Sequence, residues 1–502
     1  MEKVNLKEYI LELKKQDLLL SNLKLEEYYD LKIYGISCNS NNVVKNSIFI
    51  CKGNNFNEKY LDEAISKGAI FYLSEKEYNK QIPSILVKDI RKAMAVVTNL
   101  FYENSRESLD IVGITGTKGK STTAYYIKYI LDEYLRENLK NKCGIISSIK
   151  TYDGKNDEYS MLTTPESIEL NERFYNMKES SIKNVVMEVS SQALKYDRTY
   201  GINFKVGVFL NISEDHISPV EHSDFEDYFN SKLEMFKQTE IACINLDSDF
   251  SDKILNEAKK YCKQVITFSM KNKNADIYAS NLVKEGIGTR FNVKTNQFDR
   301  EFILNVPGIF NVENALASIA VAKALGIDSR FIYSGLKIAK TEGRMEIFKN
   351  EDESKLVIVD YAHNKLSFEK VFESAINEYP NRNIISVFGC PGNKAINRRV
   401  ELPTVASKYS NKIYLTADDP GTENPESICK EIAKNVKCDY ETIIDRKEAI
   451  KKAIESSKEN SIILVLGKGA EKIQKMGDKK EEYLSDIYYV KKYLNELAKK
   501  VD

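Results

Sequence analysis

Short apolar segments recur from residue 109 onward, and longer stretches with helical character separate most of them. The apolar segments are 109–114, 143–149, 184–189, 205–211 and 241–246. Strands that are apolar on both faces and spaced by helices are typical of a parallel sheet covered by helices on both sides. The pattern therefore predicts an α/β fold with a mostly parallel, doubly wound sheet in this part of the chain.

A second series of the same kind follows residue 342, with strands expected at 355–360, 383–388, 411–416, 441–445 and 461–467. The first hundred residues hold a third set, near KIYGISC, SIFICKG, AIFYLS and SILVKD. A chain of 502 residues is also longer than one core usually accommodates. We therefore predict three domains, at residues 1–105, 106–341 and 342–502.

Charge and cysteine content exclude several classes of function. Lys+Arg and Asp+Glu number 74 each, so the net charge is 0, which argues against a general nucleic-acid binder. No apolar run approaches the roughly 18 residues of a membrane span, and the first 20 residues are typical of a helix rather than a signal peptide. The eight cysteines form no Cys-x-x-Cys pair. We expect a cytoplasmic protein that is neither membrane-bound nor bound to nucleic acid.

The segment GITGTKGKSTT, residues 113–123, follows an apolar strand and opens a helical stretch. Glycines let a backbone approach an anion, and amides at a helix start point toward it. Lys120 is placed to reach terminal phosphates and Ser121 to bind Mg²⁺. The strict phosphate-loop pattern is narrowly missed, because Ile114 stands where its first glycine belongs. A glycine-rich turn with an exposed lysine is the alternative, but the order of strand, loop, lysine and hydroxyls favours phosphate binding.

Candidate metal ligands follow two other strands. Glu188 lies in MEVSSQAL and His216 in NISEDH, with Lys232 further along the chain. A carboxylate at the carboxyl end of a strand beside a phosphate loop is well placed for Mg²⁺, although alone it is equally typical of a helix cap. We interpret His222 as an ordinary loop residue.

The last third of the chain carries five further motifs: GRME (343–346), VDYAH (359–363), GCPGNK (389–394), TADDP (416–420) and GKGAE (467–471). Four of them lie at or just past the carboxyl end of an apolar strand, where open α/β sheets bind ligands. This placement predicts a second binding surface facing the phosphate loop.

Together with TTP (163–165) and FNVENALA (310–317), these ordered motifs resemble the Mur ligase family, most closely its UDP-N-acetylmuramoyl-tripeptide synthetases. The resemblance covers essentially the whole chain. It implies a small N-terminal α/β UDP-binding domain, a central P-loop-type ATPase domain and a C-terminal Rossmann-like domain. It also implies an ATP-dependent ligase of peptidoglycan precursor synthesis. The D-Glu γ-carboxylate of UDP-MurNAc-L-Ala-D-Glu would become an acyl phosphate, which the amine of an amino acid would then attack.

The resemblance also implies roles for individual residues. Lys120, Glu188, His216 and Lys232 would be catalytic, and Ser121, Glu188, His216 and Lys232 would serve Mg²⁺, with Lys232 carbamylated. ATP would be bound by Gly116, Thr117, Lys118, Gly119, Lys120, Ser121, Thr122, Asn314, Arg344, Asp360 and His363. The muramoyl peptide and the amino acid would be bound by Ser40, Thr163, Thr164, Ser190, Arg198, Lys394, Asp418, Asp419, Gly467 and Glu471. We expect the enzyme to be a monomer.

Departures from the family pattern bear on the amino acid that is added. Family members selecting meso-diaminopimelate have Asp-Asn-Pro-Arg where this chain has Asp418-Asp419-Pro420-Gly421. Without that arginine an extra carboxylate is disfavoured, whereas Asp419 and Glu471 suit an ammonium group. We therefore expect L-lysine first and L-ornithine second. Other departures are Lys394 for an arginine, Ala470 for a histidine, and Asn39-Ser40 for a Ser-Arg pair.

Two alternatives remain at this point. One is a Mur-type ligase that acts on a different carboxylate acceptor, such as a folyl substrate. The other is a non-catalytic scaffold that binds nucleotide and precursor, which the altered Asn39, Lys394 and Ala470 positions permit.

Overall fold

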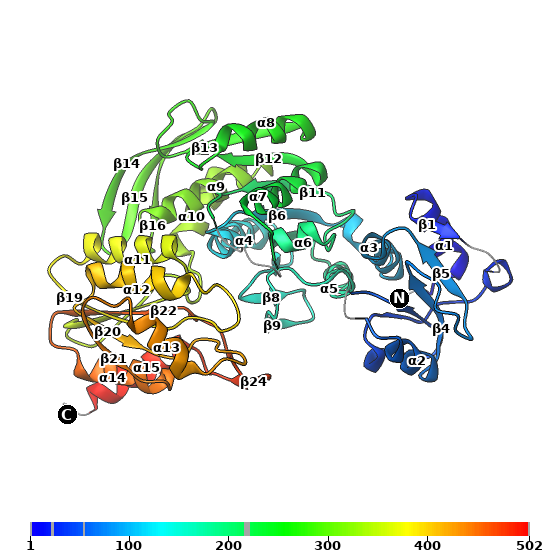
Figure 1. Cartoon of the computed structure of the whole chain (residues 1–502). Helices are drawn as coiled ribbons and strands as arrows, with labels where there is room; N and C mark the ends of the chain where they lie inside the picture. Colours follow the sequence, from blue (N-terminus) through cyan, green and yellow to red (C-terminus); the bar gives the residue numbers. More distant parts are fainter. Residues whose placement is uncertain (1–2, 22–24, 54–55, 215–220, 500–502) are drawn as a thin grey trace.

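The computed structural model describes residues 3–21, 25–53, 56–214 and 221–499. Its strands form three main sheets, each belonging to one part of the chain. Figure 1 shows the blue N-terminal part at the right, the cyan and green central part at the top, and the yellow to red C-terminal part at the lower left. The family fold predicted from the sequence, with three α/β parts, is the fold observed.

The N-terminal sheet has the strand order β1-β5-β4-β3-β2, with β1 antiparallel to β5 and the other pairs parallel. Its strands are β1 (Leu19–Ser21), β2 (Gly35–Ser37), β3 (Ser47–Ile50), β4 (Ala69–Ser74) and β5 (Ser84–Val87). Its helices are α1 (Leu6–Lys15), α2 (Glu58–Ser66) and α3 (Ile90–Phe101). Asp89 caps α3 by accepting from the amides of Arg91 and Lys92, as is common for an aspartate at that position.

The central sheet has the order β16-β15-β14-β13-β12-β11-β6-β10-β7-β8-β9. Its parallel strands are β6 (Asp110–Thr115), β7 (Gly144–Ile146), β10 (Asn184–Glu188), β11 (Phe204–Phe209), β12 (Thr239–Asn245), β13 (Gln264–Ser269) and β14 (Ile277–Glu285). The helices are α4 (Lys120–Glu137), α5 (Ser167–Glu179), α6 (Ser191–Lys195), α7 (Phe225–Leu233), α8 (Ser251–Tyr261), α9 (Phe310–Ala324) and α10 (Ser329–Ile338). All five strands predicted in this part are present, because their side chains are buried on both faces.

Two antiparallel extensions of this sheet were not predicted. They are β8 (Lys150–Tyr152) with β9 (Asp157–Tyr159), and β15 (Gly288–Lys294) with β16 (Asp299–Leu304). Their sequences mix polar, partly exposed residues with buried apolar ones, so they lack the continuous apolar pattern that marked the strands buried on both faces.

The C-terminal sheet has the order β17-β18-β22-β19-β20-β21, parallel except for β17. The strands are β17 (Glu346–Lys349), β18 (Lys355–Asp360), β19 (Asn383–Phe388), β20 (Lys412–Leu415), β21 (Asp439–Thr442) and β22 (Ser461–Leu466), and a separate hairpin joins β23 (Ile473–Met476) to β24 (Lys479–Glu482). The helices are α11 (Lys365–Glu378), α12 (Arg398–Tyr409), α13 (Pro425–Ala433), α14 (Arg446–Ser456) and α15 (Asp486–Ala498). The strand expected at 441–445 begins two residues earlier, at Asp439.

Residues at or just past the carboxyl ends of β6 and β10 in the central sheet, and of β18 and β22 in the C-terminal sheet, line one common cavity. Within the described part of the chain, the helices are too short or too polar to cross a membrane.

Candidate functional site

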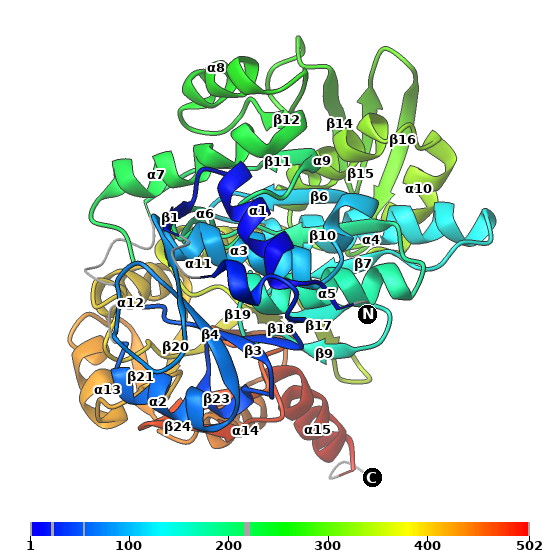
Figure 2. The same cartoon turned by 90° about the vertical axis from the view of Figure 1, so that its right-hand side faces the viewer.

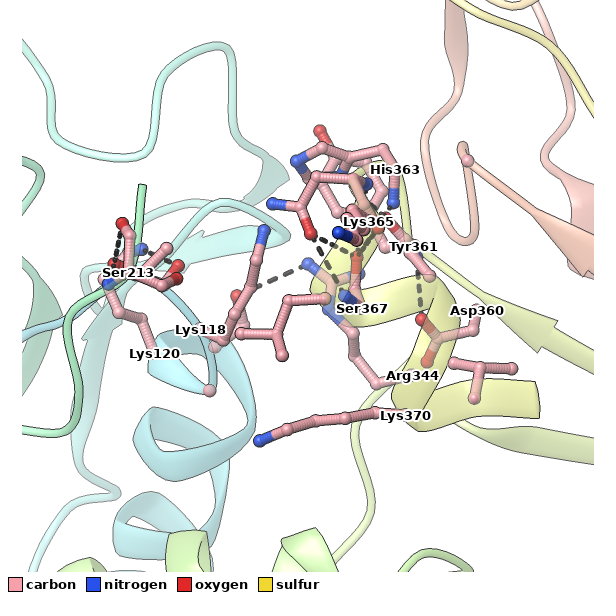
Figure 3. A pocket seen from close by; sticks show the side chains of 18 of the residues that line it. Lys118, Lys120, Ser213, Arg344, Asp360, Tyr361, His363, Lys365, Ser367 and Lys370 are labelled. Carbon is pink, nitrogen blue, oxygen red and sulfur yellow. Dashed lines mark hydrogen bonds between the residues drawn. The ribbon is translucent and has the colours of Figure 1, made fainter. Parts of the chain in front are cut away.

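A cavity of about 810 Å³ lies between the central and C-terminal parts of the chain. Of the predicted site residues, it is lined by Thr117, Lys118, Gly119, Lys120, Ser121, Thr122, Thr163, Glu188, Asn314, Arg344, Asp360, His363, Lys394, Asp418, Asp419, Gly467 and Glu471. In Figure 3, Lys118 and Lys120 extend from the cyan loop and helix on one side, and Arg344 and Lys370 come from the yellow ribbon on the other. The motifs of two sheets therefore share one cavity.

The glycines of the phosphate loop have the backbone conformations such a loop needs. Gly116 has a φ of 147° and Gly119 a φ of 86°, a region that side chains rarely adopt. A Cβ on Gly119 would lie 2.3 Å from Oδ1 of Asn314. Helix α4 begins at the next residue, so its free amides and positive end face the cavity.

Two lysines converge on the loop. Nζ of Lys120 donates to the carbonyl oxygen of Gly116 at 2.9 Å, and Nζ of Lys232 donates to the same oxygen at 3.0 Å. Lys232 is buried, and its ammonium lies 4.7 Å from the centre of the Tyr228 ring. The structure therefore brings two ammonium groups of like charge to one carbonyl oxygen.

Asn211 holds the loop from the neighbouring strand β11, a role that the sequence did not reveal. Its Oδ1 accepts from the amide of Lys118 at 2.8 Å, and its Nδ2 donates to the carbonyl oxygen of Lys118 at 3.1 Å. Its own carbonyl accepts from the amide of Thr117. Asn211 begins NISEDH, so its position at a strand end was the available signal.

Oxygen groups gather at the start of α4. The hydroxyls of Ser121 and Ser148 lie 2.9 Å apart, and the amide of Ser148 donates to Oε1 of Glu188 at 2.8 Å. Glu188 is buried at the end of β10. A hydroxyl and a carboxylate near a phosphate site are oxygen ligands of the kind that Mg²⁺ takes together with phosphates and water. Ser121 and Glu188 thus fit the predicted ion, whereas His216 lies outside the described residues.

The residues predicted to hold the muramoyl peptide lie around the end of β10. The Thr164 hydroxyl is buried, donating to the Glu188 carbonyl at 2.9 Å and accepting from the Ser190 amide at 3.0 Å. The Ser190 hydroxyl caps α6, and Thr163 lines the cavity. Thr164 therefore fixes the shape of this loop.

Arg198 makes an ion pair with Glu166, its Nε 2.7 Å from Oε1, and Glu166 also accepts from Lys52 of the N-terminal domain. Burial alone would raise the pKa of Glu166, but the pKa is lowered because these cations stabilise the carboxylate. This carboxylate, which the sequence did not single out, joins the N-terminal and central domains. Farther out, the Ser40 hydroxyl donates to Glu63 at 2.7 Å, within the N-terminal domain.

Two of the predicted ATP-binding residues, Asn314 and Asp360, come from α9 and from the end of β18. Asn314 accepts from the Thr123 hydroxyl at 3.3 Å. Asp360 is buried and accepts from the amides of Met345 and Ala362, each at 2.7 Å. Burial raises the pKa of Asp360, and the nearby Arg344 opposes that shift.

Arg344 bridges the two parts of the site. Its guanidinium carbon lies 4.3 Å from the centre of the Tyr361 ring, and its Nη2 donates to the Ser121 hydroxyl at 3.4 Å. Nδ1 of His363 lies 2.7 Å from the Tyr361 carbonyl oxygen. Arg344 thus connects the C-terminal domain to the phosphate loop.

Further cations of α11 line the cavity, and motif analysis missed them. Lys365 and Lys370 are both lining residues, and Figure 3 shows them on the side opposite Lys118. Asn364 and Ser367 form a capping box at the start of this helix. The α11 end that faces the phosphate loop therefore adds two ammonium groups and a positive helix terminus.

The predicted amino-acid subsite contains a lysine that the sequence interpretation did not weigh. Nζ of Lys468 is buried, 2.9 Å from Oδ1 of Asp419 and 2.8 Å from Oε2 of Glu471. The Tyr361 hydroxyl also donates to Glu471, at 2.9 Å. The two carboxylates expected to receive an ammonium group are therefore already paired with one.

Asp418 is buried at the back of this subsite. Burial raises its pKa, while Lys468 and Arg446 oppose that shift. A Cβ on Gly467 would lie 2.6 Å from Oδ2 of Asp418, so only glycine fits there. Lys394 lines the cavity with an exposed side chain. Three carboxylates and Lys468 leave this subsite with an excess of negative charge.

A glycine-rich loop at a helix start and a facing C-terminal sheet that share one cavity are typical of an enzyme that binds a nucleotide between two domains. Comparison with known proteins identifies the family. Residues 114–322 match the Mur ligase middle domain, and residues 343–469 match the Mur ligase glutamate ligase domain. The chain belongs to the Mur ligase family of ATP-dependent ligases, as predicted.

Individual relatives cover almost the whole chain. The chain is 35% identical over 498 residues to the UDP-N-acetylmuramoyl-L-alanyl-D-glutamate--L-lysine ligase of Streptococcus thermophilus, covering 97% of this chain and 99% of the relative. It is 36% identical over 473 residues to a 2,6-diaminopimelate ligase of Clostridium acetobutylicum, covering 93% and 94%. A solved 2,6-diaminopimelate ligase matches the fold with a TM-score of 0.68 at 23% identity, covering 99% of this chain and 100% of that chain.

Proposed function

We propose that this enzyme adds L-lysine to the D-Glu γ-carboxylate of UDP-MurNAc-L-Ala-D-Glu, with L-ornithine as the second candidate. Relatives of high coverage named as L-lysine ligases support the lysine assignment, although a relative named for 2,6-diaminopimelate has a similar identity to this chain. The choice depends on the side chains of the amino-acid subsite.

The choice of L-lysine over 2,6-diaminopimelate rests on the conformation of Gly421. It has a φ of 56°, and a Cβ there would lie 2.8 Å from Oδ1 of Asn393. An arginine at this position would be strained, so position 421 itself offers no guanidinium partner for a second carboxylate. The acidic excess of Asp418, Asp419 and Glu471 over Lys468 supports a substrate with a side-chain ammonium group.

The chain's own residues support a reaction through an acyl phosphate. Lys120 and the amides at the start of α4 bind the terminal phosphates and stabilise the charge that develops as the γ-phosphoryl group moves. Arg344 and the Lys365 and Lys370 ammonium groups approach from the C-terminal domain. The acceptor carboxylate, held near Thr163, Ser190 and Arg198, attacks the γ-phosphorus of ATP, and ADP leaves as the acyl phosphate forms. The amine bound near Asp418 then displaces phosphate.

Ser121 and Glu188 would hold a magnesium ion, which when bound supplies positive charge beside the phosphate oxygens. Carbamylation of Lys232 is also part of the proposal. It replaces one of the two ammonium groups on the Gly116 carbonyl by an anion, which removes their repulsion and adds oxygen ligands. A cytoplasmic location, expected from the scattered cysteines, and a monomeric state are also part of the proposal.

A competition assay tests the proposed function. Purified enzyme with ATP, Mg²⁺ and the muramoyl dipeptide is offered L-lysine, L-ornithine and meso-diaminopimelate together, and product masses are measured. We expect the lysine product to dominate. A diaminopimelate product would refute the argument from Gly421, and absence of product with any amino acid would refute the acceptor. The Lys120→Ala variant, which lacks the phosphate-binding ammonium, controls for background turnover.

A further inference from the structure

A buried polar cluster joins helices α6 and α7. Nε2 of His222 lies 2.9 Å from the Ser191 hydroxyl, and its Nδ1 lies 3.3 Å from Oδ2 of Asp227. The side chain of His222 is fully buried, contrary to its interpretation as an ordinary loop residue. Burial lowers its pKa, although Asp227 opposes that shift, so burial favours the neutral form of the ring. A neutral ring donates from Nδ1 to the carboxylate and accepts at Nε2 from Ser191.

These three residues have the connectivity of a Ser-His-Asp catalytic triad, but their surroundings do not suit nucleophilic catalysis. Ser191 is only 4% exposed, and none of the three lines the large cavity. Oδ2 of Asp227 is also 2.5 Å from Nζ of Lys195, so this carboxylate already neutralises a cation. The surroundings of the cluster therefore suit a structural role that connects α6 and α7, and they do not suit nucleophilic attack on a substrate.

The cluster continues to the phosphate loop through Tyr228. The rings of His222 and Tyr228 are in edge contact, with centroids 5.3 Å apart. The Tyr228 hydroxyl lies 3.0 Å from Oγ1 of Thr117, which accepts from the Ser213 amide at 3.1 Å. Thr117 lines the cavity. A continuous set of contacts therefore runs from α6 to the loop that binds phosphate.

The helices α6 and α7, which these contacts join to the phosphate loop, carry or adjoin residues that are proposed to take part in the reaction. Helix α6 lies between Ser190 and Arg198, which are proposed to hold the acceptor, and the Arg198 amide donates to the Ala193 carbonyl within it. Helix α7 carries Lys232 and packs against α6 (Figure 2). A shift of α6 relative to the loop would change the approach of acceptor carboxylate to phosphate.

We propose that His222 is a positioning residue that fixes α6, and with it the acceptor subsite, relative to the ATP-binding loop. The part of this proposal that concerns the acceptor subsite rests on the proposed function. A misplacement of about 1 Å between reacting groups lowers rate by up to about 100-fold. The neutral imidazole bonded on both sides is suited to this task because it is rigid and has a polar atom at each edge.

Three variants test this role, because they differ in which hydrogen-bonding atoms of the imidazole they retain. In His222→Gln the side-chain amide lies near the position of Nε2 and can still reach the Ser191 hydroxyl. In His222→Asn the amide lies near the position of Nδ1 and cannot reach Ser191. His222→Phe has no polar atom at either position. We expect kcat to fall about 10- to 100-fold in the Phe and Asn variants, with substantial recovery in the Gln variant. Thermal unfolding of each variant identifies those that fold. Equal kcat in all three folded variants would overturn the proposal.

Titration with ATP, in the absence of the acceptor substrate, tests the contact between Tyr228 and Thr117 of the phosphate loop. Tyr228→Phe removes one hydrogen bond to Thr117, and we expect about a five-fold weaker Kd for ATP, with a similar direction in His222→Phe. An unchanged Kd in both would overturn the link to the loop. If the wild-type enzyme ligates no amino acid, the proposed function fails. The ATP titration still tests whether His222 and Tyr228 are connected to the phosphate loop. Labelling of Ser191 by a fluorophosphonate would instead show a nucleophile and refute a positioning role.

Discussion

Replacing Arg446 by methionine tests the buried ion pair behind the amino-acid subsite. Nε and Nη2 of Arg446 each lie 2.8 Å from a carboxylate oxygen of Asp486, and both side chains are fully buried. Asp486 also accepts from the Gly469 amide at 3.0 Å and from the Tyr483 hydroxyl at 2.6 Å. The pair therefore anchors the loop at 467–471 that lines the cavity.

The Arg446→Met change leaves the Asp486 charge buried without its cation. Breaking a buried pair in this way costs about 3–5 kcal/mol of unfolding free energy. For a domain of this size each kcal/mol lowers Tm by roughly 2–4 °C, so we expect a drop of roughly 6–20 °C in the C-terminal transition. Scanning calorimetry of the full chain measures this Tm, and KM for the amino acid should rise because the loop at Gly469 loosens.

The second substitution Asp486→Asn supplies the control. It removes the uncompensated charge while keeping an oxygen for the Gly469 amide. We expect the double variant Arg446→Met/Asp486→Asn to be about 2 kcal/mol more stable than Arg446→Met alone. A single variant destabilised by less than about 1 kcal/mol, or a double variant less stable than it, would contradict the reasoning about buried charge.

Two further predictions concern the phosphate loop and the central domain. Gly119→Ala should weaken ATP binding about ten-fold or more, because its φ of 86° and the contact with Asn314 both oppose a Cβ, while Gly326→Ala, at a φ of 70° with open space, should leave the Kd unchanged. Burial alone would raise the pKa of Asp153, but hydrogen bonds including one from Arg173 lower it. Its stabilisation is present above pH 4 and lost as pH falls through the lowered pKa. Asp153→Asn should therefore reduce Tm at pH 7, and the difference in Tm from wild type should shrink as the pH falls through the lowered pKa. A difference in Tm that grows as the pH falls would contradict the stabilisation by this carboxylate.

The strands that position the site could be predicted because they are buried on both faces. β6, β10 and β11 are continuous apolar segments, so the places where they end were visible in the sequence. Thr117 follows the end of β6, Glu188 is the last residue of β10, and Asp418 follows the apolar strand β20, so these residues were found for the same reason. The antiparallel strands β15 and β16 were missed because half-exposed strands carry mixed polar and apolar residues.

Partners that come from distant parts of the chain could not be predicted. Lys468 stands in GKGAE, yet nothing local shows that its ammonium group lies between Asp419 and Glu471. The expectation of an unpaired acidic pocket omitted it for that reason. His222 was likewise interpreted from its polar neighbours, although its burial depends on α6 and α7 packing around it.

The sequence by itself determined the family, the α/β fold and the motifs that bind phosphate, since these depend on local backbone conformation and on apolar pattern. The tertiary structure decided which charges meet. It placed Lys120 and Lys232 on one carbonyl oxygen, and it joined Arg344 of the C-terminal domain to Ser121. Electrostatic and hydrogen-bond energies depend on separations of a few ångströms between residues far apart in the chain, and only the folded arrangement of the domains sets those separations.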